Sequence, residues 1–318
     1  MAVFLSENDV KQVCTVALAM EGVESAHRDL SLGVAIDTPR ARSRLPQTVL
    51  HILQGALPAQ GVIGYKAYTT NRSGNRFLVH LFDAATGELK AIIESDYLGM
   101  IRTGAVSGLA AKLLARPGTK VAGVYGAGWQ AEGHVRAICA ALPLEQVKVF
   151  SRKPDRLQNF CSRMHELTGV RVVPTNSPEA TVRESDLIGT VTTSVAPLFD
   201  ADWLMPGVHI NAAGSNALIR QELSEATVRR CGLITVDSVP TALTEAGDLL
   251  PLLEKGRLHS RQLVELGDVI TGRHAGRTSD EQITLFESQG MAIQDLAVAV
   301  RVLAAAEAAG LGQEIPLL

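Results

Sequence analysis

The residues whose spacing most directly suggests chemistry lie in the segment Val121–Ala131. It reads VAGVYGAGWQA, a G-x-G-x-x-A pattern between an apolar stretch and a helix-like one. The first glycine allows a tight turn, the second lets the backbone approach a pyrophosphate, and Ala131 lets helix and strand pack closely. The helix N-terminus adds N–H groups and a positive dipole end. This context predicts a dinucleotide site, the alternative being a tight turn without a ligand. The candidate contacts are Gly126, Ala127, Gly128, Trp129 and Gln130.

The end of the next apolar stretch bears on which nicotinamide cofactor is bound. An NAD site usually has an Asp or Glu about 20 residues further on, which holds the ribose hydroxyls. Here the stretch ends in Ser151, Arg152 and Lys153, and the next acid is Asp155. A hydroxyl and two cations suit a 2′-phosphate, because charge-assisted hydrogen bonds to phosphate are strong. The sequence predicts that NADP(H) is preferred and NAD(H) is possible through Asp155; a solvated basic turn is the other interpretation.

Further candidate cofactor contacts lie at the ends of later apolar stretches. An amide such as Asn211 can bond a nicotinamide amide or a ribose, and hydroxyls at a strand end can line the path of the cofactor. These candidates are Thr190, Val191, Thr192 and Asn211, together with Thr103.

The cofactor segments belong to a repeated pattern of strand, turn and helix that begins near residue 119. Such alternation predicts an α/β fold with a Rossmann-type, doubly wound parallel sheet. The expected strands are Val121–Tyr125, Val147–Phe150, Val170–Val173, Leu187–Thr190, Val208–Ala212 and Leu233–Val236.

The two ends of the chain predict a second, α+β domain. Residues 6–32 read as helical, with Ser6 as N-cap and Asp9 three residues on, and residues 33–98 contain strand-like segments. Residues 99–115 read as a helix that Arg116-Pro-Gly ends. The Ala/Val-rich stretch 291–310 predicts a last helix, with no strand after it, that packs on the N-terminal domain. The predicted domains are 1–113 with 296–318, and 114–295.

Composition excludes several classes of protein. The 318 residues are 46% hydrophobic and 20% charged with a net charge of −3, so no nucleic-acid or membrane partner is expected. No uncharged apolar run reaches the ~18 residues of a membrane span. The start MAVFLSENDV lacks the pattern of a signal peptide, which predicts a cytoplasmic protein. The cysteines lack metal-ligand spacing, so reduced thiols and no metal site are expected; they are Cys14, Cys139, Cys161 and Cys231.

Seven segments, in order along nearly the whole chain, resemble the ornithine cyclodeaminase/mu-crystallin family, which also includes ketimine reductases and an archaeal type of alanine dehydrogenase. The resemblance implies a homodimer formed through the substrate-binding domain, with a small imino or amino acid bound between that domain and the nicotinamide. The segments are Thr38-Pro-Arg-Ala-Arg, Gly64-Tyr-Lys-Ala-Tyr-Thr, Ile101-Arg-Thr-Gly-Ala, Gly126-Ala-Gly-Trp-Gln-Ala, Thr190-Val-Thr-Thr, His209-Ile-Asn-Ala-Ala-Gly-Ser-Asn and Gln282-Ile-Thr-Leu-Phe-Glu-Ser-Gln-Gly.

The resemblance also implies roles for single residues. Lys66 matches the active-site lysine, and Arg102 matches the arginine that grips the substrate carboxylate. Arg40 or Arg42 matches a second substrate-binding arginine, and the spacing leaves both open. His51 falls where cyclodeaminases place a glutamate. These types suit the task, because an Arg fork binds a planar carboxylate and a lysine in a dry pocket can donate a proton.

One position departs from the family's cyclodeaminases. They carry an aspartate after the H-x-N-A-x-G strand, whereas this chain has Asn216. An amide cannot accept the proton that ornithine cyclisation transfers at this point, but reduction of a preformed imine needs no such acceptor. Alternatively, Asn216 only caps a helix beginning near Leu218.

The sequence therefore predicts an NAD(P)H-dependent reductase of cyclic imino acids such as 1-pyrroline-2-carboxylate and 1-piperideine-2-carboxylate, with Lys66, Arg102 and Asn216 in the catalytic site. The alternatives are a cyclodeaminase, an alanine-type amino-acid dehydrogenase, and a non-catalytic protein that binds NADP and a small molecule.

Overall fold

The computed structural model describes residues 2–72 and 74–316 and divides into two compact units. The N-terminal unit holds the chain up to Arg102 and again from Gly290, and the parallel-sheet unit holds Thr103–Gln289. The first division falls inside the helix α3 (Asp96–Leu114), whereas the sequence placed it at 113/114. The second falls just before α11 (Ala292–Ala308), a few residues ahead of the expected 295/296.

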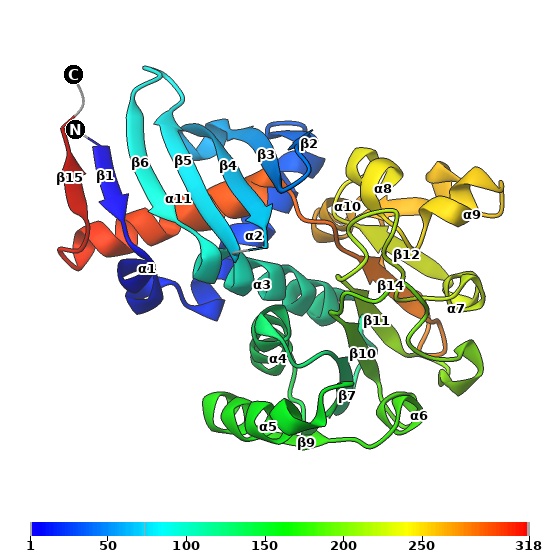
Figure 1. Ribbon diagram of the computed structural model, residues 1–318. Helices are drawn as coiled ribbons and strands as arrows, with labels where there is room; N and C mark the ends of the chain where they lie inside the picture. The colour runs from blue at the N-terminus through cyan, green and yellow to red at the C-terminus, as the bar shows by residue number, and fades with distance from the viewer. Residues whose placement is uncertain (1, 73, 317–318) are drawn as a thin grey trace. The chain divides into compact units, whose positions relative to one another are not determined.

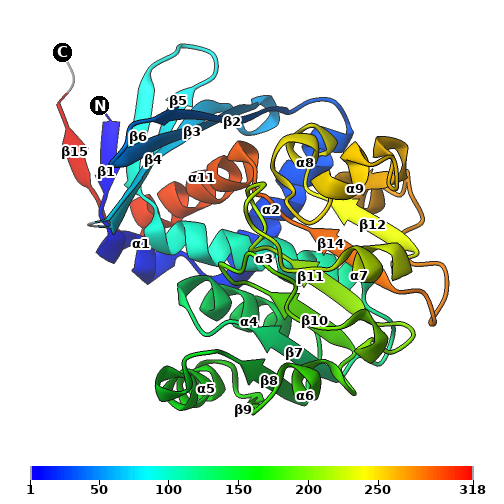
Figure 2. The same cartoon turned by 45° about the vertical axis from the view of Figure 1, so that its right-hand side comes forward.

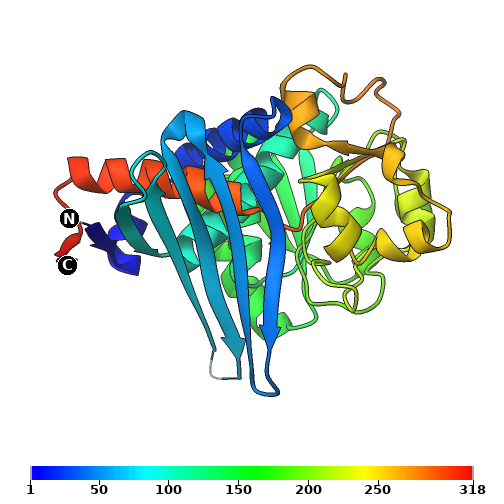
Figure 3. The ribbon, with the colours of Figure 1, turned by 90° about the horizontal axis from the view of Figure 1, so that it is seen from above.

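The N-terminal unit is built on a seven-stranded mixed sheet in the order β15-β1-β6-β5-β4-β3-β2. The long strands pair antiparallel along their length, and β1 pairs parallel with β6 (Figure 3). The elements are β1 (Ala2–Leu5), α1 (Glu7–Val13), α2 (Val16–Ser31), β2 (Ile36–Arg44), β3 (Thr48–Leu57), the 3₁₀ turn Pro58–Gln60, β4 (Val62–Asn71), β5 (Gly74–Asp83), β6 (Leu89–Glu94) and β15 (Gln313–Ile315).

Helix α11 covers one face of this sheet. It packs on β3, β4 and β5 and lies beside α2 (Figure 1). Ala, Val and Leu dominate its sequence and nearly all of its first half is buried, as expected of a helix enclosed by other elements. Gly64 on β4 allows the close approach, since a Cβ there would lie 3.1 Å from Leu296. The expected packing of the last helix on the N-terminal part of the chain is therefore observed.

The parallel-sheet unit contains eight strands, all parallel, in the order β13-β12-β14-β11-β10-β7-β8-β9 (Figure 2). The chain starts at β7, runs outward to β9, and then returns to β10 on the other side of β7, which is the doubly wound pattern. The predicted fold class is confirmed. The strands are β7 (Val121–Tyr125), β8 (Gln146–Phe150), β9 (Arg171–Pro174), β10 (Leu187–Thr190), β11 (His209–Ala212), β12 (Leu233–Val236), β13 (Leu263–Glu265) and β14 (Thr284–Glu287).

Helices and turns connect these strands, and the apolar strand side chains form two buried clusters with them. Four central strands, β10, β11, β12 and β14, are buried at every residue, because both faces of a parallel sheet are covered. The helices are α4 (Trp129–Ala141), α5 (Pro154–Thr168), α6 (Pro178–Val182), α7 (Glu225–Arg230), α8 (Val239–Glu245), α9 (Leu250–Glu254) and α10 (Leu266–Ile270), with 3₁₀ turns at Ala201–Trp203 and Ser260–Gln262.

Two expectations about local structure are wrong. A strand does follow the last helix: β15 pairs with β1 at the edge of the N-terminal sheet. No helix begins near Leu218, where residues 217–219 form a turn closed by the Arg220 N–H donating to the Ala217 carbonyl. Asn216 therefore does not cap a helix.

Candidate functional site

Lys66 lies at the middle of β4 on the sheet face that α11 covers. Its side chain is 4% exposed, and its Nζ donates to Asp295 Oδ1 at 2.9 Å. The ammonium also lies 5.3 Å from the centre of the Phe77 ring, a cation–π distance. Gly99 leaves the space that the lysine occupies, because a Cβ there would lie 2.9 Å from Nζ.

Arg102 meets the same carboxylate from α3. Its Nε donates to Asp295 Oδ1 at 2.9 Å and its Nη1 donates to Gln294 Oε1 at 2.9 Å. Gly290 has φ +81°, and a Cβ at this position would lie 2.8 Å from Arg102 Nη1. Gln294 in turn contacts the buried His27 of α2 at 3.1 Å. The structure thus brings Lys66 and Arg102 together at the N-terminal end of α11.

The electrostatics of this trio favour two cations and one anion. Burial lowers the pKa of Lys66 below its ordinary 10.5, the Asp295 carboxylate opposes this, and the Arg102 charge adds to the lowering. Burial acts to raise the pKa of Asp295, but the charges of Arg102 and Lys66 outweigh it and hold the pKa below 3.8. The first turn of a helix also stabilises a carboxylate.

The other predicted substrate residues share this face of the sheet. Arg40 Nη1 donates to the Tyr68 hydroxyl at 3.0 Å, and the Arg40 charge is among those that lower the pKa of Lys66. Arg42 lies opposite His51 in the β2–β3 register. The His51 ring stacks on Tyr68 at 4.2 Å and hydrogen-bonds Thr70. Both arginines are therefore on the Lys66 face, and Arg40 is bonded to Tyr68, a neighbour of Lys66 on β4.

His51 is neutral at pH 7. Burial, together with the charges of Arg40, Arg42 and Arg44, lowers its pKa to about 4. His80 lies on the other face of the sheet: it stacks on Tyr65, which alternates with Lys66 along β4 and therefore points away from it.

The glycine turn of the parallel-sheet unit has the geometry that a pyrophosphate needs. Gly126 has φ +116°, and a Cβ there would lie 2.7 Å from the Val191 carbonyl oxygen. Gly128 is the N-cap of α4 and no side chain caps this helix end. A Cβ at Gly128 would meet no atom within 4 Å, so the backbone is open to a ligand. The residues fit a dinucleotide phosphate at the helix N-terminus.

The basic turn follows β8, the strand next to β7. Arg152 and Lys153 are exposed, and Ser151 Oγ accepts a hydrogen bond from the Lys153 N–H at 3.2 Å. Asp155 is exposed in the first turn of α5. Because carboxyl ends of parallel strands share one edge of a sheet, this turn lies at the same edge as Gly126.

The remaining cofactor candidates differ in how deeply they are buried. Val191 and Thr192 follow β10 beside Gly126, and Thr190 is fully buried. Asn211 is 1% exposed; its Oδ1 lies 3.0 Å from His209 Nε2 and its Nδ2 donates to the Ser107 carbonyl at 2.9 Å. The bond to Ser107 joins β11 to α3 and gives Asn211 a structural role. Thr103 is half-buried in α3. Asn216 is exposed and lies directly before the turn of residues 217–219.

A group of buried carboxyls near the carboxyl edge of the parallel sheet was not anticipated. Glu222 accepts from the N–H groups of Thr192 and Gly214, and Asp248 accepts from those of Glu222 and Leu223. Burial raises the pKa of Asp248 to about 7 and, with the charges of neighbouring acids, raises that of Glu287 well above 4.5. Residues 2–72 and 74–316 hold no cluster arranged for a metal ion.

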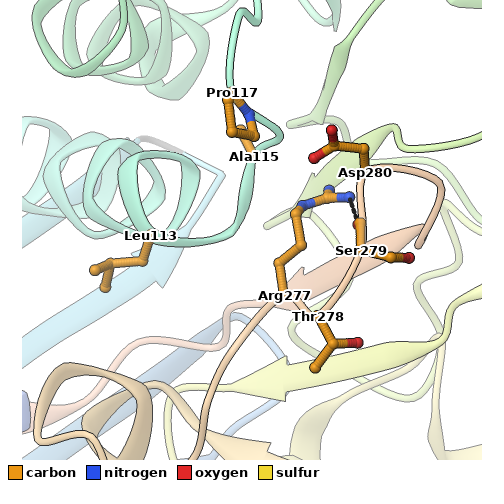
Figure 4. Close-up of a pocket in the computed structure, with 7 residues that line it drawn as sticks. All are labelled: Leu113, Ala115, Pro117, Arg277, Thr278, Ser279 and Asp280. Carbon is orange, nitrogen blue, oxygen red and sulfur yellow. Dashed lines mark hydrogen bonds between the residues drawn. The ribbon is translucent and has the colours of Figure 1, made fainter.

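A pocket of about 320 Å³ lies at the opposite edge of the parallel-sheet unit (Figure 4). Its lining residues precede β7 and β14, whereas ligands of such sheets bind at the carboxyl ends. Its guanidinium, Arg277, is already engaged: Nε donates to the Leu114 carbonyl and Nη2 to the Gly207 carbonyl and Thr284 Oγ1. The arginine of this pocket is therefore occupied by protein partners, and the other charged lining residue is the exposed Asp280.

Sequence reasoning missed Asp295 as the partner of Lys66 and Arg102, and it missed Gln294, Gly99 and Gly290. One signal was present, because Asp295 is the only charged residue between 288 and 300 in a strongly apolar stretch. In the part of the chain described, every helix is too short or too polar to span a membrane.

Comparison with known proteins agrees with these two units. The sequence profile of the ornithine cyclodeaminase/mu-crystallin family matches residues 1–310. A Delta(1)-pyrroline-2-carboxylate reductase of Bacillus cereus is 38% identical over 239 residues, which are 75% of this chain and 73% of the relative.

Two solved structures share the whole fold. The Delta(1)-pyrroline-2-carboxylate reductase of Thermococcus litoralis, in complex with NADH and L-proline, superposes with a TM-score of 0.94 at 28% identity, covering 98% of this chain and 100% of the other. An archaeal alanine dehydrogenase dimer with bound NAD has a TM-score of 0.94 at 30% identity, covering 100% and 99%. By sequence profile, identity and fold, this chain belongs to the ornithine cyclodeaminase/mu-crystallin family.

Proposed function

We propose that this protein reduces the C=N bond of a small cyclic α-imino acid, such as 1-pyrroline-2-carboxylate or 1-piperideine-2-carboxylate, to L-proline or L-pipecolate. The observation that carries the proposal is the pairing of Lys66 and Arg102 on one buried carboxylate, Asp295. The names of the Bacillus and Thermococcus relatives, and the NADH and L-proline bound in the latter, support the same reaction.

Each buried group has a task in this reaction. Arg102 binds the substrate carboxylate, because Asp295 and Gln294 hold its guanidinium in place through Nε and Nη1. Lys66 holds a proton beside the imine nitrogen and provides it when the imine arrives neutral. The bound reduced nicotinamide supplies the hydride. The low exposure of Lys66 and Arg102 limits the access of water.

Asn216 favours reduction over cyclodeamination. A cyclodeaminase must exchange protons and ammonia at the α-carbon between an oxidation and a reduction, and an amide cannot accept a proton for those steps. In this chain the residue is exposed beside the turn of residues 217–219 and caps no helix.

The proposal is tested by following reduced-cofactor oxidation with the two cyclic imines, and ammonia release from ornithine with catalytic NAD⁺. Stoichiometric oxidation with an imine and little proline from ornithine are expected. Pyruvate with ammonia serves as the comparison for an alanine-type dehydrogenase. Brisk ammonia release from ornithine without imine reduction would show a cyclodeaminase, and no turnover of any substrate would leave a binding protein as the better interpretation.

We expect NADPH to bind about tenfold or more tightly than NADH, because one charge-assisted contact to the 2′-phosphate contributes ~1.5–3 kcal/mol. The exposed Arg152 beside Ser151 is the residue expected to make it. In Arg152→Ala this preference should largely disappear, whereas Arg171→Ala, which removes an exposed arginine at the start of β9, should keep it. Titration of NADPH and NADH against the wild type and both variants measures this preference. Equal affinities in the wild type would rule it out.

We also expect a homodimer formed through the sheet face opposite α11. That face carries exposed apolar side chains, with Ile36, Leu50 and Ile63 at 62%, 36% and 48% exposure, and such patches are typical of interfaces. Light scattering at micromolar concentration should give twice the chain mass. Ile63→Asp should weaken the dimer, and Leu167→Asp on α5, a matched exposed site at 53%, should not. A monomeric wild type would contradict this.

A further inference from the structure

We propose that Asp295 accepts the N–H of the substrate's ring nitrogen and positions Lys66 beside that nitrogen, an inference that rests on the proposed reduction of a cyclic imino acid. The carboxylate is fully buried in the first turn of α11. Its Oδ1 accepts from both Lys66 Nζ and Arg102 Nε at 2.9 Å. Its Oδ2 is buried and has no hydrogen-bond partner among residues 2–72 and 74–316.

An unsatisfied buried oxygen of this kind needs a donor. Leaving a buried polar group without a partner costs about 1–3 kcal/mol, and more for a charged one. A carboxyl can avoid this cost by binding a proton, but here two cations lie within hydrogen-bond distance and a helix N-terminus adds a third favourable field. Asp295 therefore stays ionised, and Oδ2 is an acceptor for a donor that the ligand brings.

The net charge of Lys66, Arg102 and Asp295 indicates the charge that a bound ligand should carry. Lys66, Arg102 and Asp295 together carry one net positive charge in a buried place. One ligand carboxylate, held by Arg102, neutralises it. The total charge of the three side chains and the ligand is the same whether the proton resides on Lys66 Nζ or on the ring nitrogen of the imine. A linear diamino acid would add an uncompensated ammonium, which is costly to bury.

This arrangement completes the proton balance of the reduction. The imine carbon gains a hydride, the C=N π electrons become the nitrogen lone pair, and the proton on nitrogen remains as the N–H of the product. When the imine enters neutral, Lys66 Nζ gives it that proton and later recovers one from water. Asp295 stays an anion throughout and keeps the N–H directed at Oδ2.

A pair of planar ligands isolates the N–H contact without any turnover. Pyrrole-2-carboxylate and furan-2-carboxylate share ring size and carboxylate and differ in a ring N–H against a ring oxygen. In the wild type with saturating NADP⁺, calorimetry should show pyrrole-2-carboxylate binding about tenfold or more tightly, the value of one charge-assisted hydrogen bond. In Asp295→Asn the preference should fall to within about threefold or reverse, because the amide N–H₂ repels a ring N–H.

A matched control and a second readout separate this role from a structural one. Glu307→Gln, which changes an exposed carboxylate to an amide on the same helix, should keep the full preference. Loss of the Asp295 charge should also lower the pKa of Lys66, so the alkaline limb of the kcat profile moves to lower pH in Asp295→Asn. Equal binding of the two ligands by the wild type overturns the proposal, even if imines are reduced and even if the variant does not fold. A clear preference that Asp295→Asn abolishes supports it, even if no imine is turned over, which would then count against the proposed function alone.

Discussion

Lys66→Met is expected to slow imine reduction by about 10²–10⁴-fold, the usual effect of removing a positioned proton donor. Methionine fills much of the volume beside Phe77 and Gly99 but cannot donate a proton or bind Asp295. The loss should appear in kcat, with the affinity for NADPH unchanged, because the glycine turn that fits the cofactor belongs to the other unit. Single-turnover oxidation of bound NADPH measures the chemical step directly.

The control for this variant is Lys90→Met, on the same sheet. Lys90 is an exposed lysine of β6 that pairs with Asp83 at 3.4 Å, and a surface pair of this kind contributes little. It should leave kcat within about twofold of wild type. If Lys66→Met retained most of its activity while imine reduction itself was confirmed, the proton would have to come from another donor.

Arg102→Met is expected to raise KM for the imine by about 10–150-fold with a smaller change in kcat. A guanidinium that binds the substrate carboxylate in both ground and transition states contributes ~1.5–3 kcal/mol to each. Arg102→Lys should be intermediate, because it keeps the charge but loses the fork. Initial rates over a wide range of imine concentration separate the two constants.

The same variant should also destabilise the protein. Arg102→Met removes the donor to Asp295 Oδ1 and to Gln294 Oε1, and a lost hydrogen bond to a charged group costs about 1.5–3 kcal/mol. Thermal melting with and without ligand therefore accompanies the kinetics, and Arg28→Met, at an exposed i,i+4 pair on α2, is the control. An unchanged KM in a folded Arg102→Met would remove this residue from the substrate site.

The parallel sheet could be predicted because its strands are short apolar runs bounded by glycine and polar turns. Leu187–Thr190 and Leu233–Val236 coincide with β10 and β12. The strands that escaped prediction are short and depend on their neighbours. β15 has only three residues, none of them buried, and exists because β1 offers it an open edge. No local pattern reveals a partner that lies on the order of 300 residues away in sequence.

The candidate site was predictable to the extent that it rests on motifs. Gly126 and Gly128 are recognisable from their spacing alone, and Lys66 and Arg102 from the family resemblance. Asp295 was not, because its meaning depends on α11 returning to the first sheet and placing its N-terminus beside Lys66. For Asn211 the sequence suggested a ligand contact, but the residue is buried, and its amide has two protein partners, His209 on the same strand and the Ser107 carbonyl of α3.

The buried carboxyls of the parallel-sheet unit affect how the reverse reaction, oxidation of the cyclic amino acid, should be assayed. The pKa of Asp248, raised by burial from 3.8 to about 7, means that folding takes up a proton at intermediate pH. The stability that Asp248 contributes is fully present below the pKa of this group in the unfolded chain, and it is lost as pH rises through the raised pKa in the folded protein. Glu287, whose pKa is also raised, adds to this loss of stability with rising pH. Oxidation of an amine by NAD(P)⁺ releases a proton and is usually run in alkaline buffer. In such an assay these buried carboxyls would be ionised, so the fraction of folded enzyme should be measured together with any reverse rate that falls at high pH.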